Sequence, residues 1–353
     1  MSNRRWTITV LTIPGREAHL QQLLDSLRHD AARAVIHVVY NREIRDELAA
    51  TEHRIRSWVS GTQVEVFFNN GDATIAGGRN FQLNLVKTPL VCFVDDDVTA
   101  DAPLLEALES GLRRHPAAML GLPSLREDTS ERFKPRDSTP HIEDGTVRWV
   151  PVQGMLAASW TNLLRDLGGF NPRRRFWGEW TELNLRCWRH GLPTGYLMDG
   201  PHLRHWEDAP DSPTRNMSGR ELHVLWGIIC TALEYDAVDV NEATEAFWQL
   251  VEERYLSYSF GEELTPRAVL QATLSLIPEL SAAWSEITSF REQTRQHPYP
   301  FAPFHAFERA DLNRILPGAR RRIAEYRRGV WQERQTMVGG LRRLVRKVVR
   351  RET

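Results

Sequence analysis

The stretch Leu90-Val91-Cys92-Phe93-Val94-Asp95-Asp96-Asp97 decides the fold of this chain. Its five apolar residues follow Thr88-Pro89 and predict a short buried β-strand, which ends where the three carboxylates begin. In an open α/β sheet, ligands bind beyond the carboxyl ends of the strands. Carboxylate oxygens suit Mg²⁺ or Mn²⁺, and these ions bridge phosphates. The stretch therefore predicts a site for a metal ion and a diphosphate.

Strand-like runs and helical segments alternate on both sides of this stretch. Predicted strands cover 7–13, 35–40 and 64–68, and predicted helices cover 19–27, 47–59 and a segment from Gly77 to Val86. Such alternation predicts a mostly parallel, Rossmann-like α/β sheet. Residues 147–152 form a further predicted strand, and residues 159–167 and 182–190 are predicted helices. Residues 124–146 are rich in charge, Ser, Thr and Pro, so we expect a mobile loop or an excursion of the chain there.

From about residue 221 onward the pattern is helical only. We therefore expect three parts: an α/β domain over 1–218, an α-helical domain over 219–336 and a basic amphipathic helix over 337–353. The three cysteines have neither disulfide-like nor metal-like spacing, which favours a reducing compartment. No signal peptide and no apolar run of transmembrane length is evident. These features predict a cytoplasmic protein.

Charge is distributed unevenly along the chain. Residues 320–353 hold 12 Arg or Lys and 3 Glu, which gives them a net charge of +9. Because the whole chain has a net charge of −1, residues 1–319 carry a net charge of −10. The last helix would place its apolar stripe on a membrane, which predicts peripheral association with the anionic inner face. A helix packed on the body, or a dimer contact, explains the same pattern. Nucleic acid is not an expected partner, because supporting aromatic residues are missing, and the sequence assigns no oligomeric state.

Four sequence blocks occur in order along the first part of the chain: residues 12–16 (TIPGR), 77–80 (GGRN), 93–97 (FVDDD) and 167–171 (LGGFN) with 176–186 (FWGEWTELNLR). In this order they resemble the family 2 glycosyltransferases, which have the GT-A fold and transfer a sugar from a nucleotide-diphosphate donor. The resemblance runs from about Thr7 to about Asn216. This resemblance implies a GT-A domain with an appended helical domain, a nucleotide-diphospho-sugar donor with UDP or dTDP favoured, and Mn²⁺ or Mg²⁺.

The matching positions supply the expected site residues. Donor contacts are expected from Thr12, Pro14, Arg16, Asn41, Gly78, Arg79, Asn80, Asp95 and Asp96. Asp95 and Asp97 are expected to share one side of an extended strand end, with Asp97 as the direct metal ligand and Asp95 on the nucleoside side. His205, ranked above His202, is expected to complete the metal shell. Each group also has a simpler interpretation. Residues 95–97 would be a solvated acidic turn, residues 77–80 a glycine-rich surface turn, and His202 and His205 ordinary surface histidines.

One position departs from the family pattern. Inverting members carry a Glu-Asp pair after the Gly-Gly-Phe turn, and the aspartate deprotonates the acceptor, but this chain has Glu179-Trp180. An indole cannot accept a proton, so Glu179 is the expected base and Glu182 the second choice. A carboxylate favoured by the helix macrodipole is the alternative for Glu179, and a retaining enzyme needs no such base. Trp177 and Trp180 are expected to stack on the acceptor or the donor sugar, whereas Trp188 is expected in the core.

These features predict metal-dependent sugar transfer to a hydroxyl of a glycan, a lipid-linked molecule or another acceptor, with inversion and Glu179 as base. Two alternatives remain at this point. One is a sugar-nucleotide-binding or glycan-binding scaffold without catalysis, suggested by the indole at position 180. The other is a nucleotidyltransferase, which shares an acidic strand end and a glycine-rich turn.

Overall fold

A computed structural model supplies the structure of the chain. It describes residues 4–42, 48–58, 64–126, 130–135, 141–152, 154–176, 178–206, 226–227, 230–231, 233–235, 266–295, 309–310 and 312–328.

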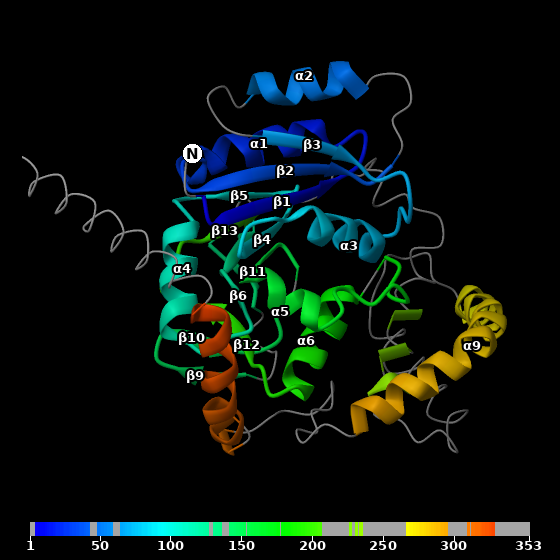
Figure 1. The fold of residues 1–353 in the computed structure, drawn as a ribbon. Helices are drawn as coiled ribbons and strands as arrows, with labels where there is room; N and C mark the ends of the chain where they lie inside the picture. Colours follow the sequence, from blue (N-terminus) through cyan, green and yellow to red (C-terminus); the bar gives the residue numbers. More distant parts are fainter. Residues whose placement is uncertain are drawn as a thin grey trace, which may run out of the picture.

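A nine-stranded sheet forms the centre of the molecule, in the order β3-β2-β1-β4-β11-β6-β12-β10-β9 (Figure 1). The strands are β1 (Trp6–Thr12), β2 (Ala34–Tyr40), β3 (Val64–Phe68), β4 (Leu90–Asp95), β6 (Met119–Gly121), β9 (Ile142–Asp144), β10 (Val147–Trp149), β11 (Leu156–Trp160) and β12 (Thr194–Leu197). Strands β3, β2, β1 and β4 pair in parallel, while β11 and β10 run against their neighbours. The prediction of a mostly parallel α/β sheet is confirmed.

A second sheet of four short strands lies beside the end of β4. Its order is β5-β13-β7-β8, with β5 at Val98–Ala100, β7 at Ser124–Arg126, β8 at Arg132–Lys134 and β13 at Leu203–His205. The expectation of a mobile loop over 124–146 is therefore wrong for the described part of that segment, which contains β7, β8 and β9. Strands of three residues are too short to show an alternating apolar pattern.

Six helices accompany the sheets. They are α1 (Glu17–Ser26), α2 (Leu48–Trp58), α3 (Ile75–Leu85), α4 (Leu105–Arg114), α5 (Thr161–Asp166) and α6 (Glu179–Arg189). The Thr74 side chain caps α3 by accepting a hydrogen bond from the Gly77 amide at 3.0 Å. The helix predicted over 159–167 begins only at Thr161, because the buried residues before it form β11.

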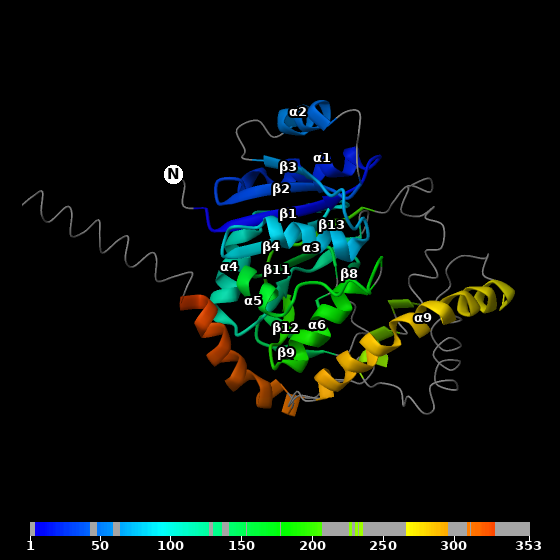
Figure 2. The ribbon, with the colours of Figure 1, turned by 45° about the vertical axis from the view of Figure 1, so that its right-hand side comes forward.

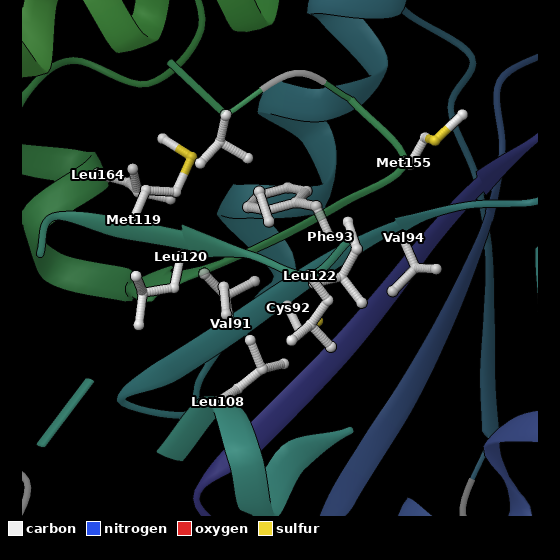
Figure 3. Packing of buried hydrophobic residues seen from close by; sticks show 14 of the residues in the cluster. Val91, Cys92, Phe93, Val94, Leu108, Met119, Leu120, Leu122, Met155 and Leu164 are labelled. Carbon is white, nitrogen blue, oxygen red and sulfur yellow. The ribbon is translucent and has the colours of Figure 1, made fainter. Parts of the chain in front are cut away.

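The core is built around β4. Its five apolar residues are each at most 1% exposed, and Figure 3 shows four of them, residues 91–94, among Leu108 of α4, Met119 of β6 and Leu164 of α5. At about 1.5–3 kcal/mol for each large apolar side chain, this strand contributes on the order of 10 kcal/mol of burial free energy. Burial of β4 therefore fixes in place the chain that carries the three aspartates.

Two further helices follow the α/β region. Helix α9 spans Pro266–Arg295, and a second helix covers 312–328. The latter buries Leu312, Ile315 and Ile323 in the same core, and Arg327 Nε donates to the Leu112 carbonyl at 3.1 Å. Figure 2 shows α9 at the opposite side of the molecule from this helix. The basic helix expected over 337–353 lies outside the described residues, as do both sides of the expected boundary at 218/219.

In the described part of the chain, every helix falls short of the length and apolar character needed to cross a membrane.

Candidate functional site

The parallel pairing of β1 with β4 brings two of the sequence blocks together. Leu11 lies opposite Asp95 in the register, so the turn after β1 meets the acidic turn after β4. Strand β4 ends at Asp95, and Asp96 and Asp97 form the turn that leads into β5. Pro14 is exposed at the tip of the first turn, whereas Arg16 is buried and directed toward the aspartates. The site therefore lies at the carboxyl edge of the sheet.

Asp96 is held entirely by the chain itself. Its Oδ2 accepts from Thr12 Oγ1 at 2.6 Å and from Arg16 Nε at 3.1 Å, and Arg16 Nη2 lies 3.0 Å from its Oδ1. Burial raises the pKa of Asp96 to about 7, although the positive charge of Arg16 acts in the opposite direction. The hydrogen bond between Thr12 and Asp96 therefore joins the turn after β1 to the turn after β4. This disfavours the expected contacts of these two side chains with the donor.

Asp97 lies between Arg16 and His205. Its Oδ2 is 2.9 Å from Arg16 Nη2 and 3.8 Å from His205 Nε2. Both the Asp97 and the His205 side chains remain about one-fifth exposed, so the pair is open to solvent. The His205 ring stacks on Phe133 of β8, with centroids 4.5 Å apart and planes 3° apart. This stacking holds the ring of the histidine that was ranked above His202 as a metal ligand.

His202 does not belong to this group. Strand β13 pairs antiparallel with β5, with His205 opposite Val98 and Leu203 opposite Ala100. The His202 amide instead donates to Asp101 Oδ1 at 3.0 Å, at the far end of β5. The register therefore places His202 away from the His205–Asp97 pair, and its expected role as a metal ligand stays a prediction.

The fit of a metal ion can be tested on these residues. Among the described residues, no group of three or more His, Cys, Asp or Glu side chains converges as a complete metal shell. Two ligands at about 2.1 Å from one ion are at most about 4.2 Å apart, and the Asp97 to His205 separation of 3.8 Å meets this limit. Mg²⁺ commonly takes one or two protein ligands and completes its shell with substrate phosphates and water. An oxygen and an imidazole nitrogen fit that role.

Asp95 faces a different set of partners. Its carboxylate forms an ion pair with Arg79 of α3, and its Oδ2 accepts from the Met155 amide at 2.7 Å. The expectation that Asp95 and Asp97 share one side is wrong, because regular strand alternation ends at Asp95 and the next two residues turn. Direct metal ligation by Asp95 is correspondingly disfavoured. The Arg79 guanidinium lies 5.5 Å from the centre of the Trp180 ring, which holds the ion pair against the core.

Glu179 opens α6 beside this ion pair. Its side chain is nearly buried at 8% exposure, and the preceding Gly178 has the left-handed φ of +82° that turns the chain into the helix. Burial raises the pKa of Glu179 to about 7, Arg79 opposes the rise, and the negative charge of Asp95 adds to it. A carboxyl group with a pKa near neutrality is matched to general-base chemistry.

Glu182 is excluded as a second base. It is fully buried, its two oxygens accept from Arg186 at 3.1 and 2.6 Å, and Tyr235 Oη donates to its Oε1 at 2.7 Å. Both oxygens are therefore engaged inside the protein. Helical spacing alone placed Glu182 one turn from Glu179, but burial gives it a structural role.

Trp180 packs in the core and does not form an acceptor platform. It is 6% exposed and lies edge-on to Phe93 and Phe170 at centroid distances of 5.7 and 4.9 Å. The expectation that it stacks on a sugar is wrong for this structure. Trp177, the other expected platform, lies outside the described residues. Trp188 is fully buried and donates to Thr194 Oγ1 at 3.0 Å, as its core assignment predicted.

Three of the expected donor-binding residues instead build the scaffold. Asn41 Nδ2 donates to the carbonyls of Ala73 and Thr74, both at 2.9 Å, and its Oδ1 accepts from Asn69. A Cβ on Gly78 would lie 2.7 Å from Asn41 Oδ1, so glycine is needed for close packing there. Asn80 exchanges two hydrogen bonds of 2.8 Å with the Phe170 backbone. These contacts hold α3, and with it Arg79, against the Gly-Gly-Phe turn.

Some residues that contact the site were not predicted from the sequence. The Met155 amide reaches Asp95 from a residue with φ of +58°, and backbone groups leave no trace in residue type. Phe133 was hidden in the segment read as a loop, although an aromatic residue between Arg132 and Lys134 in a charged stretch could have indicated a strand. Three consecutive arginines, 173–175, were also not singled out.

Comparison with known proteins gives a likeness in structure. No protein-family model matches the sequence, and no curated protein matches it. The structure of GalNAc-T7 with UDP, GalNAc and Mn²⁺ matches with a TM-score of 0.56 at 13% identity, covering 82% of this chain and 55% of the other. S. aureus TarS 1–349 with UDP-GlcNAc matches with a TM-score of 0.57 at 14% identity, covering 92% of each chain.

A further structure of S. aureus TarS 1–349 gives a TM-score of 0.51 at 15% identity and covers 94% of this chain and 92% of that one. The chain spans about half the length of the GalNAc-T7 chain and nearly all of the TarS fragment. Identities of this size show a shared fold. The chain therefore has the GT-A fold of nucleotide-sugar transferases.

Proposed function

We propose that this protein is a glycosyltransferase that moves a sugar from a nucleotide-diphosphate donor to an acceptor hydroxyl. The observation that carries the proposal is Glu179, a nearly buried carboxyl group beside the Arg79–Asp95 pair at the carboxyl edge of a GT-A sheet. Structures of similar fold contain UDP with GalNAc and Mn²⁺ in one case and UDP-GlcNAc in another. A UDP sugar is therefore the proposed donor, with dTDP sugars next.

The proposed reaction is a single displacement with inversion. The acceptor oxygen forms a bond to the anomeric carbon of the donor, the bond from that carbon to the diphosphate oxygen breaks, and the diphosphate leaves with the electron pair. Glu179 takes the proton from the attacking hydroxyl. A base with a pKa near 7 is ionised in about half of the molecules at neutral pH and still binds a proton well. Arg79 tunes this group because its positive charge favours the ionised form.

Asp97 and His205 are the proposed ligands of Mn²⁺ or Mg²⁺. When bound, the ion supplies positive charge next to the departing diphosphate. Arg16 adds a fixed positive charge 2.9 Å from Asp97 Oδ2. Diphosphate binding therefore meets positive charge from the chain as well as from the ion.

The acceptor is proposed to be a glycan or a lipid-linked molecule. The basic amphipathic pattern of residues 337–353 supports a membrane-surface location, because about 1 kcal/mol per basic residue favours contact with anionic lipid. A lipid-linked acceptor would then be reached from the cytoplasmic face by a peripheral protein.

UDP release from UDP-GlcNAc and UDP-GalNAc tests the function. Transferases leak sugar to water, so the wild type with Mn²⁺ should release UDP without added acceptor. Glu179→Gln should release it at least about 100-fold more slowly, because a general base contributes about 10²–10⁴-fold. Glu106→Gln, at an exposed position of α4, is the matched control and should keep the wild-type rate. Metal-dependent UDP binding with no turnover of any donor would favour the binding scaffold instead.

A further inference from the structure

The loop that precedes Glu179 is fastened to helices from much later in the chain. Three consecutive arginines in this loop each pair with a glutamate beyond residue 225. Arg173 Nε lies 2.7 Å from Glu234 Oε1 and its Nη1 lies 3.2 Å from Glu286 of α9. Arg175 Nη1 lies 2.9 Å from Glu279 of α9. The described residues of the loop over 171–178, which leave out Trp177, thus receive their charge partners from the helical region.

Glu234 is the centre of these contacts. It is fully buried, it pairs with the fully buried Arg174 as well as with Arg173, and it accepts from Asn171 Nδ2 at 3.4 Å. A buried ion pair of this kind is strongly destabilised when one partner is removed, because the other charge stays buried. One carboxylate therefore ties three residues of the loop to the segment around residue 234.

Neighbouring contacts bring the same restraint to Gly178. Trp226 Nε1 donates to the Arg173 carbonyl at 2.7 Å. A Cβ on Gly178 would lie 3.9 Å from Gly227 Cα, so Gly227 packs against the glycine that caps the start of α6. On the other side, Arg79 and Asp95 act on the Glu179 carboxyl. Residues 178–179 are therefore enclosed between the helical region and the acidic edge of the sheet.

The loop also reaches the helix that carries Arg79. The Ala76 amide in the first turn of α3 donates to the Arg175 carbonyl at 3.3 Å. A shift of the loop would consequently move Glu179 and the start of α3 together. Small displacements of this kind are costly in catalysis, since misplacement by about 1 Å can lower the rate about 100-fold.

We propose that the helical region positions Glu179 for catalysis, with Glu234 as the positioning residue that holds the 171–178 loop. This inference deepens the proposed transfer function and rests on Glu179 acting as the base. Glu234 contacts neither donor nor acceptor in this account, so its loss should lower kcat and leave donor binding intact.

The test compares Glu234→Gln with Trp226→Phe and a matched control in the full-length chain. Trp226→Phe removes only the indole donor and keeps an aromatic ring, so it reports on the loop if Glu234→Gln folds poorly. The control is Glu109→Gln, because Glu109 pairs with Arg5 and Arg113 near the start of β1, away from the loop. Hydrogen exchange over 171–180 and steady-state UDP release are measured for all four proteins.

Glu234→Gln should exchange at least about tenfold faster over 171–180. Its kcat should fall by about 10-fold to 100-fold, while KM for the donor stays within about twofold of wild type. Trp226→Phe should change both quantities in the same direction by less, and Glu109→Gln should change neither.

The proposal is overturned if kcat is unchanged while exchange rises, if KM carries the loss, or if Glu109→Gln behaves like Glu234→Gln. Should the wild type itself release no UDP, the transfer function fails on its own. Exchange over 171–180 then decides whether Glu234 holds the loop: faster exchange in Glu234→Gln alone supports the restraint, and unchanged exchange refutes it.

Discussion

Replacing Glu179 by glutamine should make the protein more stable at neutral pH while removing its activity. Burial raises the pKa of Glu179 from 4.5 to about 7. Because the folded-state pKa lies above the unfolded value, the unfolded chain ionises first as pH rises. Folding stability from this group is fully present below about pH 4.5 and is lost as pH rises through about 7. Because glutamine does not ionise, the Glu179→Gln variant does not lose this folding stability as pH rises.

The magnitude follows from the two pKa values. Because the pKa rises from 4.5 to about 7, holding the ionised group in the folded state costs on the order of 3 kcal/mol. At 8% exposure, solvent screens this cost little. Between pH 5 and pH 8, the free energy of unfolding of Glu179→Gln should rise relative to wild type by roughly 2–3 kcal/mol.

Urea denaturation at pH 5, 6, 7 and 8 measures this difference. Glu182→Gln is the matched comparison on the same helix, and it should lose about 3–5 kcal/mol because it breaks the buried pair with Arg186. A difference between Glu179→Gln and wild type that stays constant with pH would refute the reasoning, since it would mean that Glu179 has an ordinary pKa. A loss of stability that grows with pH would refute it as well.

Three other changes test separate parts of the structure. Arg79→Gln should shift the acid limb of the kcat/KM pH profile to higher pH, because Arg79 lowers the pKa of Glu179. An unchanged acid limb would show that Arg79 does not act on the pKa of Glu179. Asn80→Ala should lower the free energy of unfolding by about 1–3 kcal/mol in urea, since it removes both bonds to Phe170; a neutral result would contradict those bonds. Deleting residues 337–353 should abolish co-sedimentation with anionic vesicles but leave UDP release from a soluble donor intact, and retained sedimentation would reject the membrane role.

The central part of the fold could be predicted because its signals are local. The apolar run before Asp95 has the length and composition of a buried strand, and the alternation around it leaves little choice but a parallel sheet. Strand β11 was missed because residues 156–160 read as the approach to a helix, and it pairs only with β4 and β6, which are distant in sequence. Within 124–146, β7 depends in the same way on the distant strand β13, whereas β8 and β9 pair with the nearby strands β7 and β10 and are too short to show a pattern.

The site was predictable in its location and much less so in its detail. Because β1 and β4 are neighbouring parallel strands, their carboxyl ends lie together, and so do the turns that follow them. The partners of each side chain depend on depth and register, which residue type does not encode. Asn80 and Glu182 have suitable chemistry for a site, but tertiary packing engages their polar atoms internally. The antiparallel register of β13 places His205 opposite Val98, next to Asp97, and this supports ranking His205 above His202.

The most direct test of the account is calorimetric titration of UDP with and without Mn²⁺ into wild type, Asp97→Asn and Asp101→Asn. Asp101 lies at the other end of β5, beside His202, and serves as the matched control. The account predicts that UDP binding requires Mn²⁺ in wild type and in Asp101→Asn, and that Asp97→Asn weakens it at least about tenfold. Equal UDP affinity in all three proteins, or an affinity indifferent to Mn²⁺, would contradict a metal–diphosphate site at Asp97.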